Sequence, residues 1–136
     1  MYNEEILDIY DEELKDVGPW KVFAIIGLIL SIIALVLGPI SVLFALFSDY
    51  DAYVWYLTQY NDQLLANSYI FFTALEISYG LTFGAAGLIL SILGKKSTKQ
   101  KGKAVKGIII SVIGLALNII ALLIMLFGIA IAASSL

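Results

Sequence analysis

Apolar residues fall into three long runs, each of which follows a polar stretch. The runs cover residues 22–47, 70–93 and 107–130. Each run exceeds the roughly 20 residues that an α-helix needs to cross the hydrocarbon core of a bilayer. The pattern therefore predicts an all-α integral membrane protein with three transmembrane helices. Composition agrees, because 61% of the chain is hydrophobic, against about 45–50% in soluble domains.

Small residues recur inside each run, alternately three and four positions apart. The first run has Gly27, Ser31, Ala34, Gly38 and Ser41; the second has Gly80, Gly84, Gly87, Ser91 and Gly94; the third has Gly107, Ser111, Gly114, Asn118 and Ala121. This spacing places each set, called here a small stripe, on one face of a helix. Helices in lipid associate by close van der Waals packing, so we expect the small stripes to form the seams of a tight three-helix bundle.

The last two runs are joined by the short stretch of residues 95–106, so we expect them to form an antiparallel hairpin. If the two helices pair outward from this loop, Gly87 lies opposite Gly114. In the same register, Gly84 lies near Asn118.

Pro39 interrupts the first run past its middle. Proline has no N–H to donate to the carbonyl group of Leu35, so a kink is expected there. Two interpretations remain open, a hinge and a kink that a neighbouring helix accommodates.

The first polar stretch, residues 1–19, is strongly acidic and precedes the membrane domain of residues 20–136. Apolar side chains recur in it at helical spacing, at Ile6, Tyr10 and Leu14, so we expect a cytoplasmic amphipathic helix. It is either a solvated tail that lies on its own protein or a docking helix for a basic partner.

The second polar stretch, residues 48–69, is rich in Tyr, Trp and Asp. We expect an outer aromatic helix or loop, which either lies on the bilayer surface or extends the second span. Clustered Tyr and Trp side chains suit the headgroup boundary of a membrane. A carbohydrate or peptide site is the alternative to an aromatic belt.

Lysines gather between the second and third runs, in residues 95–106, where no acidic residue occurs. They are Lys95, Lys96, Lys99, Lys101, Lys103 and Lys106. Short lysine-rich loops stay in the cytoplasm, so we expect the loop and the N-terminus inside and the C-terminus outside. The lysines should also contact anionic lipid headgroups, each contributing about 1 kcal/mol near the surface.

Two polar side chains inside the predicted spans, Glu76 and Asn118, are candidates for an intramembrane polar site. Glu76 binds a proton or cation if it lies at mid-membrane, and is a polar helix end if it lies at the interface. Counting from Gly94 as the inner end places Glu76 about 27 Å away, which favours the interface. Asn118 either bonds a neighbouring helix or lines a pathway, and helix packing is the favoured role.

The inventory of reactive side chains argues against catalysis. The chain has no Cys and no His, which excludes thiolate and imidazole chemistry and the metal sites built on them. We therefore expect no catalytic residue, no metal site and no cofactor, and predict that the chain is not an enzyme. The expected partners are the bilayer and other membrane proteins in a homo- or hetero-oligomer, with no nucleic acid.

The string Gly-Leu-Ile-Leu-Ser at residues 87–91, the Lys-Gly-Lys-Ala loop and the string Gly-Ile-Ile-Ile-Ser at residues 107–111 carry a resemblance. They resemble a group of small uncharacterised bacterial membrane proteins of the domain-of-unknown-function type, which have paired glycine-rich spans around a short basic loop. The resemblance implies a bacterial plasma membrane location. It implies no activity and no functional residues.

Three functional hypotheses follow. The first is a non-enzymatic accessory or scaffold subunit, which packs helices through its small stripes and meets a cytosolic partner through its acidic tail. The second is a homo-oligomeric channel or transporter subunit, with Glu76 and Asn118 facing a pathway. The third is an outer-surface binding or immunity protein that uses residues 53–69.

Overall fold

A computed structural model of the chain describes residues 19–135, which form helices joined by short connections and contain no strand. The acidic helix expected before Pro19 lies outside these residues. The helices are α2 (Trp20–Phe47), α3 (Tyr50–Thr58), α4 (Gln63–Ser68), α5 (Phe71–Gly94) and α6 (Lys101–Ser134). Within the described part, α2, α5 and α6 are long and apolar enough to cross a membrane. The predictions of an all-α fold and of three long apolar helices are confirmed.

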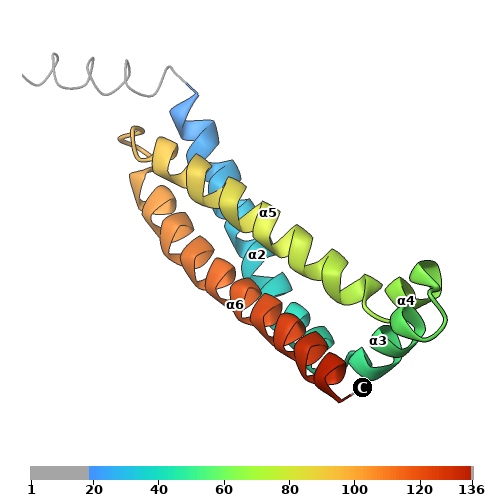
Figure 1. The fold of residues 1–136 in the computed structure, drawn as a ribbon. Helices are drawn as coiled ribbons and strands as arrows, with labels where there is room; N and C mark the ends of the chain where they lie inside the picture. Colours follow the sequence, from blue (N-terminus) through green and yellow to red (C-terminus); the bar gives the residue numbers. More distant parts are fainter. Residues whose placement is uncertain (1–18, 136) are drawn as a thin grey trace, which may run out of the picture.

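The three long helices lie side by side, with α5 antiparallel to α2 and α6 (Figure 1). The start of α2 and the connection between α5 and α6 share one end of the bundle, called here the lysine end. The short helices α3 and α4 lie at the opposite, aromatic end, where α6 finishes. Helix α2 packs more extensively against α5 and against α6 than those two pack against each other, which makes α2 the central helix of the bundle.

The interior of the bundle is built from small side chains and its exterior from large apolar ones. Every residue of the three small stripes is buried. The largest side chain that is completely buried is that of Asn118, while large aliphatic side chains such as Val36, Leu43 and Ile131 are exposed. A water-soluble bundle has the opposite arrangement, with its leucines and isoleucines inside.

The repeated five-residue strings show this arrangement at its smallest scale. Each string begins with a buried glycine and ends with a buried serine. The central isoleucines, Ile29, Ile89 and Ile109, are 52%, 58% and 56% exposed. Positions i and i+4 of a helix share a face, and position i+2 points away from it. Each five-residue string therefore places small residues on the inner face of its helix and a bulky isoleucine on the outer face.

Gly87 of α5 and Gly114 of α6 each lie closest to the central helix. A Cβ atom on Gly87 would lie 2.8 Å from the backbone nitrogen of Ser31, and one on Gly114 would lie 2.9 Å from that of Leu35. The predicted pairing of Gly87 with Gly114 is therefore wrong. Helix α2 makes the closest backbone approach to both partners.

The predicted proximity of Gly84 to Asn118 is also wrong, by one helical turn. Gly80 takes that place, since a Cβ atom there would overlap the Asn118 side chain. A Cβ atom on Gly84 would instead lie 2.7 Å from a methyl carbon of Leu115. With α2 packed against both helices of the hairpin, their register is set by three-helix contacts and cannot be counted outward from the loop.

Helix α6 begins at Lys101, so the predicted loop of residues 95–106 is only half a loop. Residues 101–106 form helix because Ala104 is buried and continues the small stripe of α6 toward the lysine end. The remaining connection is fixed by Ser97, whose hydroxyl accepts a hydrogen bond of 3.2 Å from the Gln100 N–H.

Pro39 does not divide α2, which continues to Phe47. The proline ring lies on the exposed side of the helix, next to buried Gly38. A Cβ atom on Gly38 would lie 2.8 Å from Cβ of Leu117, so α6 packs closely against α2 at this level. The choice between a hinge and a kink that a neighbouring helix accommodates stays a prediction.

Residues 48–69, expected as an outer aromatic helix or loop, form two short helices with a turn between them. Asp49 begins α3 by accepting a hydrogen bond of 2.9 Å from the Ala52 N–H. Asp62 begins α4 in the same way, with 3.1 Å to the Leu65 N–H. Between the helices Asn61 has φ 50°, the left-handed conformation that Asn tolerates better than most residues. The turn therefore needs no glycine or proline.

Candidate functional site

Asn118 forms a polar junction between the three long helices. Its Oδ1 accepts a hydrogen bond of 2.9 Å from the Ser41 hydroxyl. Its Nδ2 group donates to the carbonyl groups of Gly114, at 2.8 Å, and Ala34, at 3.4 Å. The absent side chain of Gly80 leaves the space that the amide occupies. All these partners belong to the same chain, which favours the packing role predicted for Asn118.

Glu76 lies in the second turn of α5 and is partly buried. Its next neighbour, Ile77, belongs to a buried apolar cluster with Ala45 and Ala121. The Oε2 atom of Glu76 is buried and has no hydrogen-bond partner in the described part of the chain. Glu76 comes five positions after Phe71, which begins α5, so it stands about 7.5 Å along the helix axis from that end. Among the described residues, no hydrogen bond joins Glu76 to Asn118.

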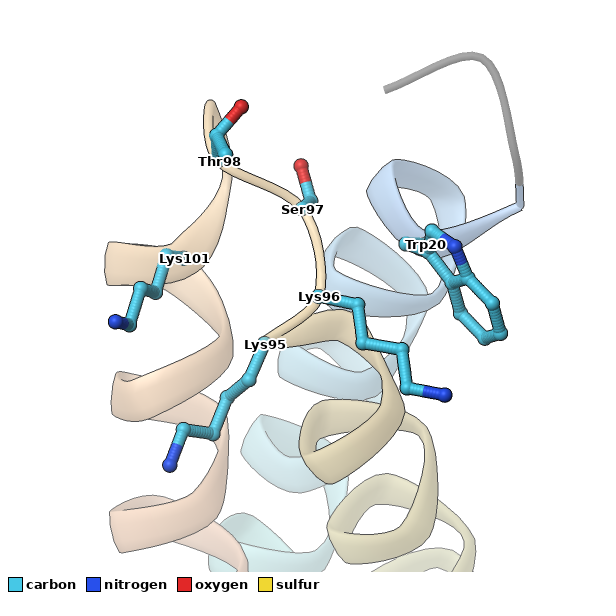
Figure 2. A pocket seen from close by; sticks show the side chains of 6 residues that line it. All are labelled: Trp20, Lys95, Lys96, Ser97, Thr98 and Lys101. Carbon is cyan, nitrogen blue, oxygen red and sulfur yellow. The ribbon is translucent and has the colours of Figure 1, made fainter. Parts of the chain in front are cut away.

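The lysine end carries a cavity of about 410 Å³. It is lined by Trp20, Lys95, Lys96, Ser97, Thr98 and Lys101. Figure 2 shows the side chains of Lys95 and Lys101 extending on one side of the loop and that of Lys96 on the other. The lysines therefore do not converge on one point. These three side chains spread positive charge over the lysine end of the bundle.

Lys96 also contacts an aromatic ring. Its Nζ atom lies 4.3 Å from the ring centroid of Trp20, within the range of a cation–π interaction. This contact joins the loop after α5 to the first residue of α2 (Figure 2). Trp20 is thus held at the same level of the bundle as the lysines, where an interfacial tryptophan is expected.

At the aromatic end, Tyr50 anchors α3 to the bundle. Its hydroxyl donates a hydrogen bond to the carbonyl group of Ala45, and its ring lies directly over Gly128, where a Cβ atom would overlap it. Val54 and Ala132 are buried nearby, each only 4% exposed. Helix α3 is therefore packed on α6 and does not extend freely from α2.

A second anchor ties the end of α2 to the start of α5. The hydroxyl groups of Ser48 and Thr73 share a hydrogen bond. Thr73 also donates to the carbonyl group of Phe44 at 3.1 Å. The two bonds hold the start of α5 against the end of α2. They therefore fix the two points between which the segment of α3 and α4 is attached.

Between these anchors lies a cavity of about 690 Å³, called here the aromatic-end cavity. It is lined by Asp49, Asp51, Ala52, Trp55, Tyr56, Tyr69, Ala132 and Ser135. These residues come from four places: the α2–α3 connection, α3, the turn after α4 and the end of α6. The sequence of residues 48–69 favoured an aromatic belt, with a carbohydrate or peptide site as the alternative. It did not predict this cavity, since the residues that α6 contributes lie far away in the sequence.

Two tyrosines form one wall of the aromatic-end cavity. The rings of Tyr56 and Tyr69 stack with centroids 5.6 Å apart and planes 9° from parallel. A hydrogen bond with Tyr56 raises the pKa of Tyr69, and desolvation and the negative charge of Asp49 raise it further. Tyr69 is therefore a neutral phenol at physiological pH, close to a carboxylate.

Comparison with protein-family models, curated proteins and solved structures gives no match to this chain. The resemblance to bacterial membrane proteins with a basic loop therefore stays a prediction. Three features of the chain bear on its function: the buried small stripes beneath exposed aliphatic side chains, the Asn118 junction, and the charged residues at the two ends of the bundle.

Proposed function

We propose that the chain is a three-span integral membrane protein that acts without catalysis, as an accessory or scaffold subunit. One observation carries the proposal: the small stripes are buried and the large aliphatic side chains are exposed. In water such a surface would far exceed the few hundred Å² of contiguous apolar area that soluble monomers tolerate. In lipid it costs nothing, because acyl chains are as apolar as leucine.

The scaffold role is supported by how the small stripes are used. All three pack against other helices of the same chain, and the Asn118 amide finds its partners within that chain. Partner proteins are therefore left with the bulky outer faces and the two ends of the bundle. The internal pairing of Asn118 weighs against a subunit in which it lines a pathway.

The charged segments suggest where each partner binds. We place the lysine end on the cytoplasmic side of a bacterial plasma membrane, against anionic headgroups, with the C-terminus outside. The acidic segment before Pro19 then lies in the cytoplasm, where it is available to a basic surface of a partner. Seven acidic residues against one lysine in that segment support a partner of opposite charge.

Crosslinking in native membranes tests the scaffold role. The full chain is compared with a variant in which Glu4, Glu5 and Asp8 become Gln, Gln and Asn, and with a control in which Lys99 and Lys103 become Gln. The proposal predicts a crosslinked product that the tail variant loses and the loop control keeps, with both variants still in the membrane fraction. Release of the chain by alkaline carbonate, or the same product from the tail variant, would contradict it.

A further inference from the structure

The aromatic-end cavity combines two carboxylates with three aromatic side chains. Asp49 and Asp51 border it together with Trp55, Tyr56 and Tyr69. Its volume of about 690 Å³ falls within the range of about 300–1,000 Å³ that is typical of sites for small organic molecules. A site of this size and lining selects a ligand by charge and by contact with ring faces.

Positive charge is absent from the part of the chain that builds most of this cavity. No Lys or Arg occurs between Lys21 and Lys95, and Lys101, Lys103 and Lys106 lie at or near the other end of α6. Within residues 19–135, the carboxylates of Asp49 and Asp51 therefore have no nearby basic side chain to neutralise them. Asp49 uses Oδ1 as the cap of α3, which leaves its charge and its second oxygen in place.

The rings distinguish an organic cation from a metal ion. The described part of the chain contains no group of three or more Asp, Glu, His or Cys side chains that could hold a metal, and Ca²⁺ requires six to eight oxygen ligands. Aromatic faces attract a cation that sheds its water easily, and methylated ammonium groups are bound in this way by aromatic cages. The combination of two carboxylates and ring faces suits such a cation.

The walls of the cavity are fixed before any ligand arrives. Tyr50 holds α3 on Gly128, and the stack of Tyr56 on Tyr69 joins α3 to the turn before α5. The cap formed by Asp49 sets the direction in which α3 begins. Binding a ligand therefore needs little ordering of the protein, and a preorganised site loses less affinity to conformational entropy.

We propose that the aromatic-end cavity binds an organic ammonium ion, with Asp49 and Asp51 supplying negative charge and Trp55, Tyr56 and Tyr69 supplying ring faces. The site is independent of the scaffold role, because it requires only that the chain is folded. The ammonium group comes either from a free small molecule or from the headgroup of a choline lipid in the adjoining leaflet.

Tryptophan fluorescence measures binding at this site. The chain has two tryptophans, and Trp20→Phe leaves Trp55 as the only one. The purified variant in a maltoside detergent is titrated with tetramethylammonium chloride and, at equal ionic strength, with sodium chloride or calcium chloride. We expect a saturable change in Trp55 emission with tetramethylammonium alone. A response to sodium of equal size, or a saturable response to calcium alone, would overturn the proposal.

Asparagine substitutions separate charge from structure. Asn caps a helix as well as Asp does, so the double variant Asp49→Asn with Asp51→Asn keeps the start of α3 and removes both charges. We expect it to bind tetramethylammonium at least about tenfold more weakly, because two negative charges at short range from the cation are removed. Asp62→Asn, which does not line the cavity, is the matched control. Equal affinities in all three proteins, with unchanged circular dichroism, would overturn the assignment.

The two sources of the ammonium group are told apart in lipid nanodiscs. If a lipid headgroup is the ligand, nanodiscs of phosphatidylcholine already fill the cavity, and added tetramethylammonium changes Trp55 emission only in phosphatidylglycerol nanodiscs. If the ligand is a free molecule, both nanodiscs respond. No response in either nanodisc would overturn the proposal for the protein in a membrane.

Discussion

The hydroxyl of Ser41 donates a hydrogen bond of 2.9 Å to the side-chain oxygen of Asn118, which joins two positions 77 residues apart in the chain. The pair links α2 to α6 at the level where Gly80 of α5 leaves room for the amide. One polar contact thereby fixes the relative height of three helices whose other contacts are small and repetitive. It is the feature that most clearly distinguishes one register of the bundle from another.

Two buried serines form a matched pair for testing this junction. Ser41 has a partner in Asn118, whereas the buried Ser91 hydroxyl has no hydrogen-bond partner within residues 19–135. We expect Ser41→Ala to lower the free energy of unfolding by about 1 kcal/mol, because the amide loses a buried donor. Ser91→Ala should be neutral or stabilising, because it removes an unsatisfied group. Unfolding in mixed micelles with increasing dodecyl sulfate measures both, and a larger loss for Ser91→Ala would contradict the structure.

The glycines offer a second matched pair. A Cβ atom on Gly87 would lie 2.6 Å from the Ser31 hydroxyl oxygen, and one on Gly102 would meet nothing within 4 Å. We expect Gly87→Ala to destabilise the bundle by about 1–3 kcal/mol through overpacking. Gly102→Ala should stabilise α6 by up to about 1 kcal/mol through helix propensity. The same micelle titration compares them, and equal effects would count against close packing of α2 on α5.

Gly102 is also the position of choice for testing orientation. The chain has no native Cys, and a side chain at residue 102, in the first turn of α6, has open space around it, whereas Ser97 in the preceding loop is buried. We expect Gly102→Cys in intact cells to resist a membrane-impermeant maleimide and to react after the cells are opened. Labelling from outside would reverse the proposed orientation.

Alkaline pH should weaken the aromatic end before the rest of the bundle. Burial raises the pKa of Tyr50 above 10.0, and the hydrogen bond with Ser48 opposes this only in part; the pKa of Tyr69 is also raised. The folded state favours the neutral phenols, so their stabilising effect is complete below pH 10.0 and is lost as the pH rises through the folded-state pKa values.

Ultraviolet difference absorbance during an alkaline titration measures these ionisations. We expect Tyr50 and Tyr69 to ionise above pH 10.0, because the pKa of each is raised, and Tyr50→Phe to remove one of these two ionisations. Titration of all tyrosines at the ordinary pKa would show that α3 is not packed on α6 as described.

The buried faces of the long helices could be predicted from the sequence because residues such as Gly27, Ser31 and Ala34 recur with the period of a helix. The register, which is the relative height of the helices along the bundle, could not be predicted. Small stripes repeat every turn, so one-turn shifts such as Gly84 for Gly80 keep a small residue at each contact. The side chains that distinguish the observed register from a one-turn shift are Leu115, which packs on Gly84, and Asn118, which packs on Gly80. Both contacts are between helices and leave no local pattern in the sequence.

The aromatic end was harder to predict for a different reason. The break between α3 and α4 depends on Asn61 in a left-handed conformation, a weaker signal than glycine or proline. The cavity combines Asp51 and Trp55 with Ala132 and Ser135, residues that no local pattern connects. Helix α6 also begins earlier than expected because lysines are good helix formers and do not by themselves mark a loop.

The central claim is that bulky aliphatic faces meet lipid while small faces meet each other. Nitroxide labels on cysteines placed singly at Ile29, Ile89 and Ile109 test it in liposomes, through relaxation by lipid-soluble oxygen and by a water-soluble nickel chelate. The account predicts strong relaxation by oxygen and weak relaxation by nickel at all three positions, which are more than half exposed. Strong relaxation by nickel, or protection from both agents, would contradict it.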